Sequence, residues 1–160
     1  MAAGAEVRID AKEFSKLGAD VKEFDPALYR RLRKSLRDAG QVGVEGVREK
    51  LAEGSPAGGP DEGTNRSLLA AATRVAVSFA KRGGSVKITT SGSRLPPAHS
   101  ALLAAYNTRQ WRHPVFGSET FVSQTGLPYF YGPVMKAGHR EMGKGIEAAL
   151  DEAVRAMGAR

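Results

Sequence analysis

The chain has 160 residues, of which 41% are hydrophobic and 26% are charged, a composition typical of a single soluble globular domain spanning residues 1–160. Its 24 basic and 17 acidic residues give a formal net charge of +7, which favours polyanionic partners such as nucleic acid or an acidic protein face. The absence of cysteine excludes disulfides and thiolate metal sites and fits a reducing cytoplasm. With no apolar run of about 20 residues and no signal-peptide pattern, we expect neither a membrane partner nor secretion.

The N-terminal third predicts one short strand and two amphipathic helices. Polar and apolar residues alternate over 6–10, which favours a strand. Asp25 and Pro26 are a typical N-cap and first helical residue, so a long helix is expected from 26 to about 52. The preceding helix begins near Lys12 and is indicated by apolar residues three or four positions apart: Phe14, Leu17, Val21 and Phe24.

Three glycines, Gly40, Gly43 and Gly46, form a strip of low bulk in the second half of the long helix. Glycine lowers helix propensity, so one interpretation, which the sequence slightly favours, is a loose or kinked segment. The other interpretation is that a second backbone approaches the helix closely at this strip.

Five basic residues crowd the first half of the same helix, and no acid occurs among residues 27–37. Cations near a helix N-terminus oppose the helix dipole, so the placement is unfavourable by itself. A solubilising face is the preferred interpretation, and a contact with DNA phosphates or an acidic partner is the alternative. The residues are Arg30, Arg31, Arg33, Lys34 and Arg37.

The middle of the chain predicts a loop, a short helix and a β-hairpin. Residues 53–65 are rich in Gly and Pro and indicate a long loop. A helix through 68–72, capped by Asn65 or Ser67, is expected to follow. Two alternating apolar runs on either side of Gly83 and Gly84 then predict a hairpin.

The C-terminal half predicts a short helix from His99 to Tyr106 and a strand at Phe121 and Val122. A final helix is expected from Tyr129 or Pro133 to Met157, with Gly158 as its stop and an apolar stripe at Met142, Ile146, Leu150, Val154 and Met157. The fold class is therefore α+β, with a small antiparallel β-sheet flanked by a long N-terminal helix and a long C-terminal helix.

No pattern in the chain indicates catalysis. His99, His113 and His139 are 14 and 26 residues apart, without the short ligand spacing of a zinc site. Phosphate-binding loops, nucleophile elbows and HExxH motifs are absent, and the acidic pair at 61–62 has no identifiable third carboxylate. We therefore expect no enzyme activity, no catalytic residue, no metal and no cofactor.

The stretch WRHPVFGSETFVSQTGLPYFYGPV, residues 111–134, holds the only Trp and six of the eleven aromatic residues. Base-stacking surfaces combine aromatic with basic residues on strands, whereas these aromatics are accompanied by Pro and Gly. The pattern favours rigid turns that carry apolar anchors into a core or a subunit contact. Trp111 is included among these anchors.

This stretch resembles a motif of the neck and tail-completion family of long-tailed bacteriophages. In that family a His-Pro-x-Phe-Gly turn precedes a short strand, a Gln, and a Pro-aromatic-aromatic sequence that leads into the last helix. Phe121 stands where the family often has Trp. The matching residues are His113, Pro114, Phe116, Gly117, Gln124, Pro128, Tyr129 and Phe130.

The resemblance implies a virion structural protein of the head–tail junction, present in the host cytoplasm before assembly. Relatives form homo-oligomeric rings, commonly hexamers, between the connector and the tail tube, with genomic DNA passing through the lumen and other neck proteins on each face. Tail completion or tail termination is the expected role, and a head-closure (stopper) ring is the alternative.

Two further alternatives stay open. The turn residues of the motif either close the core of the subunit itself or contact the neighbouring subunit; they are His113, Pro114, Phe116 and Gly117. A basic DNA-binding regulator is the rival from another functional class. The absence of a second helix directly after residue 52 disfavours a helix-turn-helix repressor.

Overall fold

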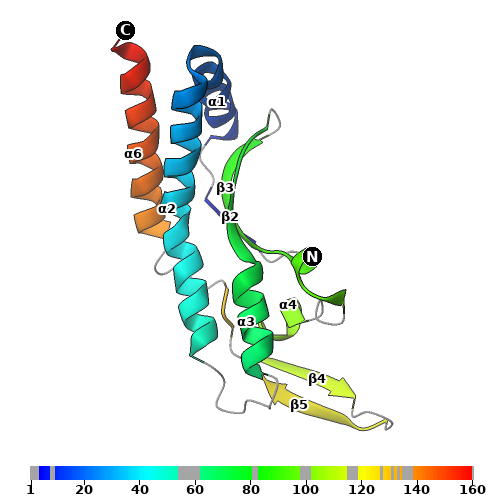
Figure 1. The fold of residues 1–160 in the computed structure, drawn as a ribbon. Helices are drawn as coiled ribbons and strands as arrows, with labels where there is room; N and C mark the ends of the chain where they lie inside the picture. Colours follow the sequence, from blue (N-terminus) through cyan, green and yellow to red (C-terminus); the bar gives the residue numbers. More distant parts are fainter. Residues whose placement is uncertain are drawn as a thin grey trace.

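A computed structural model describes most of the chain, and its elements are arranged as Figure 1 shows. The described residues are 4–7, 10–53, 62–80, 83–97, 102–114, 119–126, 128–130, 132, 134 and 139–159. The elements are β1 (Gly4–Val7), α1 (Ala11–Phe24), α2 (Pro26–Ala52), α3 (Glu62–Ala72), β2 (Thr73–Ala80), β3 (Gly83–Thr90), the 3-10 turn η1 (Gly92–Arg94), α4 (Leu102–Ala105), β4 (Gln110–Pro114), β5 (Phe121–Thr125) and α6 (His139–Gly158).

Aspartate side chains cap both N-terminal helices. Asp10 accepts a hydrogen bond of 2.9 Å from the backbone N–H of Lys12 at the start of α1. Asp25 accepts one of 2.7 Å from the N–H of Ala27, next to the proline that begins α2. Each carboxylate satisfies a backbone donor that the helix leaves free. The predicted boundary at residue 25 and the 27-residue helix after it are confirmed.

Three antiparallel strands form the main sheet, in the order β1-β3-β2. Strands β2 and β3 pair from Thr73 with Thr90 to Ala80 with Gly83, which confirms the predicted hairpin. The glycine pair does not make the turn, however, because Gly83 and Gly84 belong to β3. A Cβ built on Gly84 would lie 2.3 Å from the Phe14 ring, so this glycine is needed where α1 packs on the strand.

Helix α2 lies between the sheet and α6, which runs beside it in Figure 1. Gly40 and Gly43 face the sheet: a Cβ on Gly43 would lie 2.2 Å from Cδ1 of Ile88, and Gly40 meets Val75 in the same way. Another side of α2 packs against α6, where a Cβ built on Gly145 would lie 2.8 Å from the Cβ of Ala39. The preference for a loose or kinked segment is therefore wrong, because α2 is one continuous helix that the sheet approaches closely.

Helix α6 covers His139–Gly158 and ends at Gly158 as expected. Its predicted start, at Tyr129 or Pro133, falls on a stretch in which residues 131, 133 and 135–138 lie outside the described part of the structure. Met142 and Ile146 are buried, but Val154 is 53% exposed. A step of four residues rotates about 40° around a helix, so an apolar row of such steps drifts away from α2. Ala149 and Ala153 are buried instead of Val154.

Several smaller boundaries also differ from prediction. Strand β1 covers 4–7, where the sequence predicted 6–10, and α4 covers 102–105; residues 8–9 and 99–101 of the two predicted elements lie outside the described part. Helix α3 begins at Glu62, so residues 62–65 of the predicted loop are helical, and residues 54–61 lie outside the described part. Strand β4 was not predicted at all. The α+β class, with a small antiparallel sheet and long N-terminal and C-terminal helices, is confirmed.

Candidate functional site

The aromatic motif forms a two-stranded hairpin that leaves the body of the molecule at the end of α2 and α3 opposite the C-terminus (Figure 1). Strands β4 and β5 pair antiparallel, with Trp111 opposite Gln124 and Pro114 opposite Phe121. The sequence predicted a turn over 112–117, but 112–114 are strand. Proline is compatible with this position because a two-stranded ribbon leaves one edge of each strand unpaired.

Two aromatic residues that follow the hairpin belong to the core. Tyr129 and Phe130 are 1% and 2% exposed, and their rings meet edge to face with centroids 6.3 Å apart. These two residues were expected among the anchors of a subunit contact, and in the structure of the single chain both rings pack into its own core. Pro128, which precedes them, is half-buried.

Polar contacts fix the base of the hairpin. Asn107 Oδ1 accepts a hydrogen bond of 3.1 Å from the backbone N–H of Phe130, and the N–H of Gly126 donates to the carbonyl of Arg109 at 3.0 Å. A Cβ on Gly126 would lie 2.1 Å from the carbonyl oxygen of Thr108, so only glycine fits there. Residues 107–109 and 126–130 are therefore held together at the base by these two hydrogen bonds and by the close approach that Gly126 permits.

Helix α3 supports the same region through a buried arginine. Arg66 is buried, its guanidinium lies 5.3 Å from the centroid of the Tyr106 ring, and it donates to the carbonyl of Leu51 at 3.5 Å. Asn65 reaches the Tyr106 hydroxyl at 3.5 Å. No role was predicted for Arg66, Tyr106, Asn107 or Gly126. For Gly126 the available signal was its nearness to Pro128, two positions on, since Gly and Pro between periodic segments mark turns and loops.

The hairpin itself carries exposed apolar side chains. Phe121 is 53% exposed and Val122 is 36% exposed, whereas Trp111 is half-buried. Arg112 places its guanidinium 5.6 Å from the centroid of the Phe121 ring. The outer part of the motif thus presents an aromatic and a branched side chain next to a cation, on a ribbon with a fixed base.

Part of the predicted site lies outside what can be described. The backbones of His113, Pro114 and Gln124 belong to the hairpin, but their side chains are outside the described part of the structure. Phe116 and Gly117 are entirely outside it. Their predicted contact with a neighbouring subunit stays a prediction.

The basic residues of α2 do not act as one group. Arg31 pairs with Glu152 of α6 at 2.7 Å, and Lys34 pairs with Asp38 one turn along at 3.0 Å. Arg33 turns toward the sheet and donates to the carbonyl of Val77 at 3.2 Å, while its Nε is buried without a hydrogen-bond partner.

Arg30 and Arg37 are exposed, and among the described residues neither makes a salt bridge. These two are the members of the run that are free to meet an external anion.

Among the described residues, no group of three or more His, Cys, Asp or Glu side chains could hold a metal ion. The helices described for this chain include none with the length and apolar character required to cross a membrane.

Burial raises the pKa of Tyr129 above its ordinary value of 10.0, and a hydrogen bond with Thr90 offsets part of that rise. The Thr90 hydroxyl also lies 2.7 Å from that of Thr73, so the tyrosine belongs to a buried polar network of structural character.

Comparisons with protein-family models, with curated proteins and with solved structures return no match to this chain.

Proposed function

We propose that this chain is a non-enzymatic assembly protein of the phage head–tail junction, which forms a homo-oligomeric ring and uses the β4–β5 hairpin to contact its neighbour in the ring. The observation that supports this most is the contrast between the two parts of the motif. Tyr129 and Phe130 are fixed in the core, while Phe121 and Val122 are exposed on the projecting ribbon.

Such an arrangement is suited to docking. An isolated two-stranded ribbon is only marginally stable in water and gains stability when its apolar face packs against something else. Because the base is already ordered by Gly126 and Asn107, little conformational entropy is lost there on binding. Large aromatic side chains are also the commonest energetic anchors of protein interfaces.

The resemblance of residues 111–130 to the neck and tail-completion motif supports the phage context. A closed ring repeats one head-to-tail contact, in which the hairpin of one subunit meets a different surface of the next. Tail completion or termination is the proposed role, with six subunits around the DNA channel between the connector and the tail tube. The exposed pair Arg30 and Arg37 is the candidate contact with DNA or an acidic neighbour.

The test compares a hairpin variant with a matched control. Phe121→Ser combined with Val122→Ser should leave the subunit folded, because both side chains are exposed, and should abolish ring formation. Val42→Ser combined with Val154→Ser removes two exposed valines outside the hairpin and should leave ring formation intact. Light scattering after size-exclusion chromatography, and copy number in purified particles, measure the outcome.

Normal rings from the hairpin variant would show that the hairpin does not make the contact. Absence of the chain from mature particles, together with nanomolar binding to a defined DNA duplex, would instead establish the DNA-binding regulator.

A further inference from the structure

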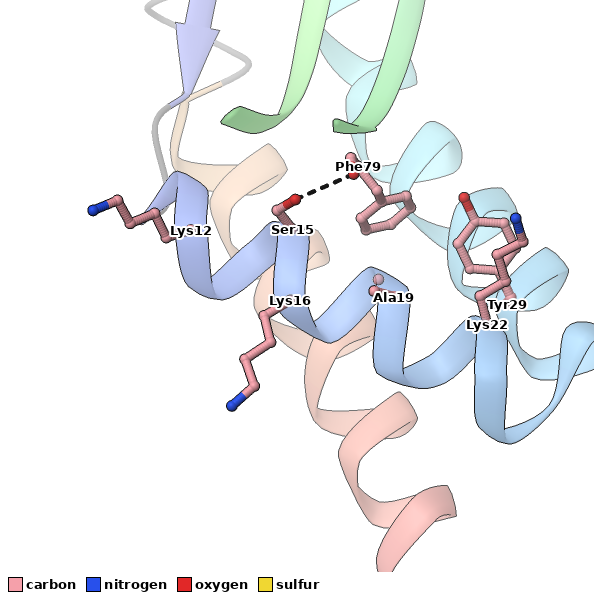
Figure 2. Close-up of a pocket in the computed structure, with 8 residues that line it drawn as sticks. Lys12, Ser15, Lys16, Ala19, Lys22, Tyr29 and Phe79 are labelled. Carbon is pink, nitrogen blue, oxygen red and sulfur yellow. Dashed lines mark hydrogen bonds between the residues drawn. The ribbon is translucent and has the colours of Figure 1, made fainter. Parts of the chain in front are cut away.

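A groove opens between α1, the first turn of α2 and the end of β2 (Figure 2). It has a volume of about 380 Å³. The floor combines Phe79 of β2 and Tyr29 of α2 with Gly18 and Ala19 of α1, and lysines of α1 also line the groove. In Figure 2, Lys22 lies beside Tyr29, whereas Lys12 and Lys16 extend away from the Phe79 ring. The lining residues are Lys12, Ser15, Lys16, Gly18, Ala19, Lys22, Tyr29 and Phe79.

The floor of the groove is apolar and tightly supported. The Phe79 ring is stacked on Phe14 with centroids 4.8 Å apart, and Tyr29 is tilted against it at 5.5 Å. A Cβ on Gly18 would lie 2.2 Å from the Phe79 ring, so α1 sits directly against it. The Ser15 hydroxyl donates to the carbonyls of Phe79 and Ala80, at 3.2 and 2.9 Å, and so is occupied within the fold.

Three lysines of α1 line the groove, and no acid of that helix does. The three lysines, Lys12, Lys16 and Lys22, border the groove, and among the described residues none of them makes a salt bridge. At about 100° per residue, Glu13 and Asp20 fall on the arc next to that of the lysines, whereas Glu23 falls at the same angle as Lys12 and Lys16 but nearer the C-terminal end of the helix. None of the three acids lines the groove. Those acids are Glu13, Asp20 and Glu23, all exposed.

A fourth cation lies behind the aromatic floor. The Arg33 guanidinium is 5.8 Å from the centroid of the Tyr29 ring. The potential at the groove is therefore positive on the α1 side and next to Tyr29, and no described acid lines it. A ligand that fits must carry negative charge at its edges and an apolar group at its centre.

We propose that this groove binds an acidic peptide segment of a partner protein, which places one large apolar side chain on the Phe79–Tyr29 floor and its carboxylates beside Lys12, Lys16 and Lys22. Lysine stems extend apolar surfaces while their ammonium groups stay in water, so they can flank such an anchor and pair with its neighbouring carboxylates. The groove and the β4–β5 hairpin lie at different places in the fold, so this inference does not depend on the hairpin's role.

The shape of the groove favours a peptide over nucleic acid. A phosphate backbone has no apolar group to fill a concave aromatic floor, and the Ser15 hydroxyl is already used. One face of Phe79 is stacked on Phe14, and Tyr29 is inclined to Phe79 by 47°, so the floor has no pair of parallel faces between which a base could stack.

The experiment measures fluorescence anisotropy of a short labelled peptide of Glu and Asp with one central Phe, titrated with the full chain. We expect Lys12→Glu, Lys16→Glu and Lys22→Glu together to weaken binding at least about tenfold. A control variant carries the same change in charge at exposed residues outside the groove: Arg94→Glu, Arg140→Glu and Lys144→Glu. This variant should weaken peptide binding less than about threefold.

Filling the groove gives a second, charge-neutral test. Ala19 is exposed and lines the groove, so Ala19→Trp should leave the fold intact and weaken peptide binding at least about tenfold. The hairpin variant with Phe121→Ser and Val122→Ser should bind the peptide normally, which separates this proposal from the ring contact.

Three results would overturn the proposal. The first is equal binding of a peptide in which Ser replaces the Phe, since the floor would then contribute nothing. The second is binding of a DNA duplex that is weakened by the three lysine substitutions and unchanged by Ala19→Trp, which would assign the groove to nucleic acid. The third is no binding of the Phe peptide by the unaltered chain at low salt.

Discussion

Gly40 of α2 lies directly against Val75 of β2: a Cβ built on Gly40 would lie 2.6 Å from Cγ1 and 3.0 Å from Cγ2 of Val75. Real side chains do not approach this closely, and a β-branched residue has little rotamer freedom with which to withdraw. The sheet and the long helix can therefore pack at this distance only because residue 40 has no side chain.

Gly40→Ala should lower the free energy of unfolding by about 1–3 kcal/mol, because overpacking outweighs the roughly 1 kcal/mol by which alanine favours a helix. Gly143→Ala is the matched control, since Gly143 lies in α6 and a Cβ added there would meet nothing within 4 Å. That change should raise the free energy by about 0.5–1 kcal/mol. Urea denaturation measures both, and a stabilised Gly40→Ala variant would contradict the packing described.

Gly126→Ala should loosen the base of the hairpin. The new methyl group would meet the backbone oxygen of Thr108 at 2.1 Å, and a backbone atom cannot move aside as a side-chain tip can. We expect faster amide hydrogen exchange along β4 and β5 and a changed fluorescence of Trp111, the only tryptophan, which lies in β4. Gly132→Ala, where an added Cβ would meet nothing within 4 Å, should leave both signals unchanged.

Tyr129 should make the stability of the fold depend on pH in the alkaline range. Burial raises the pKa of its hydroxyl above 10.0, so the folded state favours the neutral form. This contribution is complete below the ordinary pKa and is lost as the pH rises through the higher folded value. Denaturation at a series of pH values should show a steeper loss above about pH 10 for the unaltered chain than for Tyr129→Phe. Parallel curves would refute the linkage.

Tyr129→Phe should also cost about 1 kcal/mol near neutral pH, because it removes the hydrogen bond with Thr90. The loss is expected to be modest, since the Thr90 hydroxyl keeps its contact with Thr73 at 2.7 Å.

Two kinds of arginine in α2 should respond differently to neutralisation. Arg33→Gln removes a donor to the carbonyl of Val77 and a partner of the Tyr29 ring, so it should lower the free energy of unfolding by about 1–2 kcal/mol. Arg30→Gln combined with Arg37→Gln changes exposed side chains and should alter it by less than about 0.5 kcal/mol. Equal losses in thermal or urea denaturation would show that Arg33 has no structural role.

Local sequence was sufficient for the elements whose signals are themselves local. The Asp25-Pro26 boundary, the extent of that helix to Ala52 and the stop at Gly158 follow from capping chemistry and apolar spacing, and these were predicted. The loose or kinked second half that was favoured for the same helix was wrong. The β2–β3 hairpin was predicted from alternation, but its turn was misplaced because Gly84 serves a contact with Phe14, 70 residues away in the chain. The structural role of a glycine therefore cannot be predicted from its sequence neighbours alone.

The candidate site was likewise predicted in part from the sequence. Composition and spacing singled out the aromatic motif and the basic run, but they could not show that Tyr129 and Phe130 are core residues while Phe121 and Val122 are exposed. Nor could they show that Arg33 turns inward.

The long helices, the alternation of the hairpin and the supply of charged and aromatic residues could all be read from the chain, since each depends on residues a few positions apart. Three other properties required the packed fold: which side chains face solvent, which glycines are contact points, and which lysines of α1 line a groove with Phe79. The reason is that burial and close approach are set by segments that are distant in the chain and meet only when it folds.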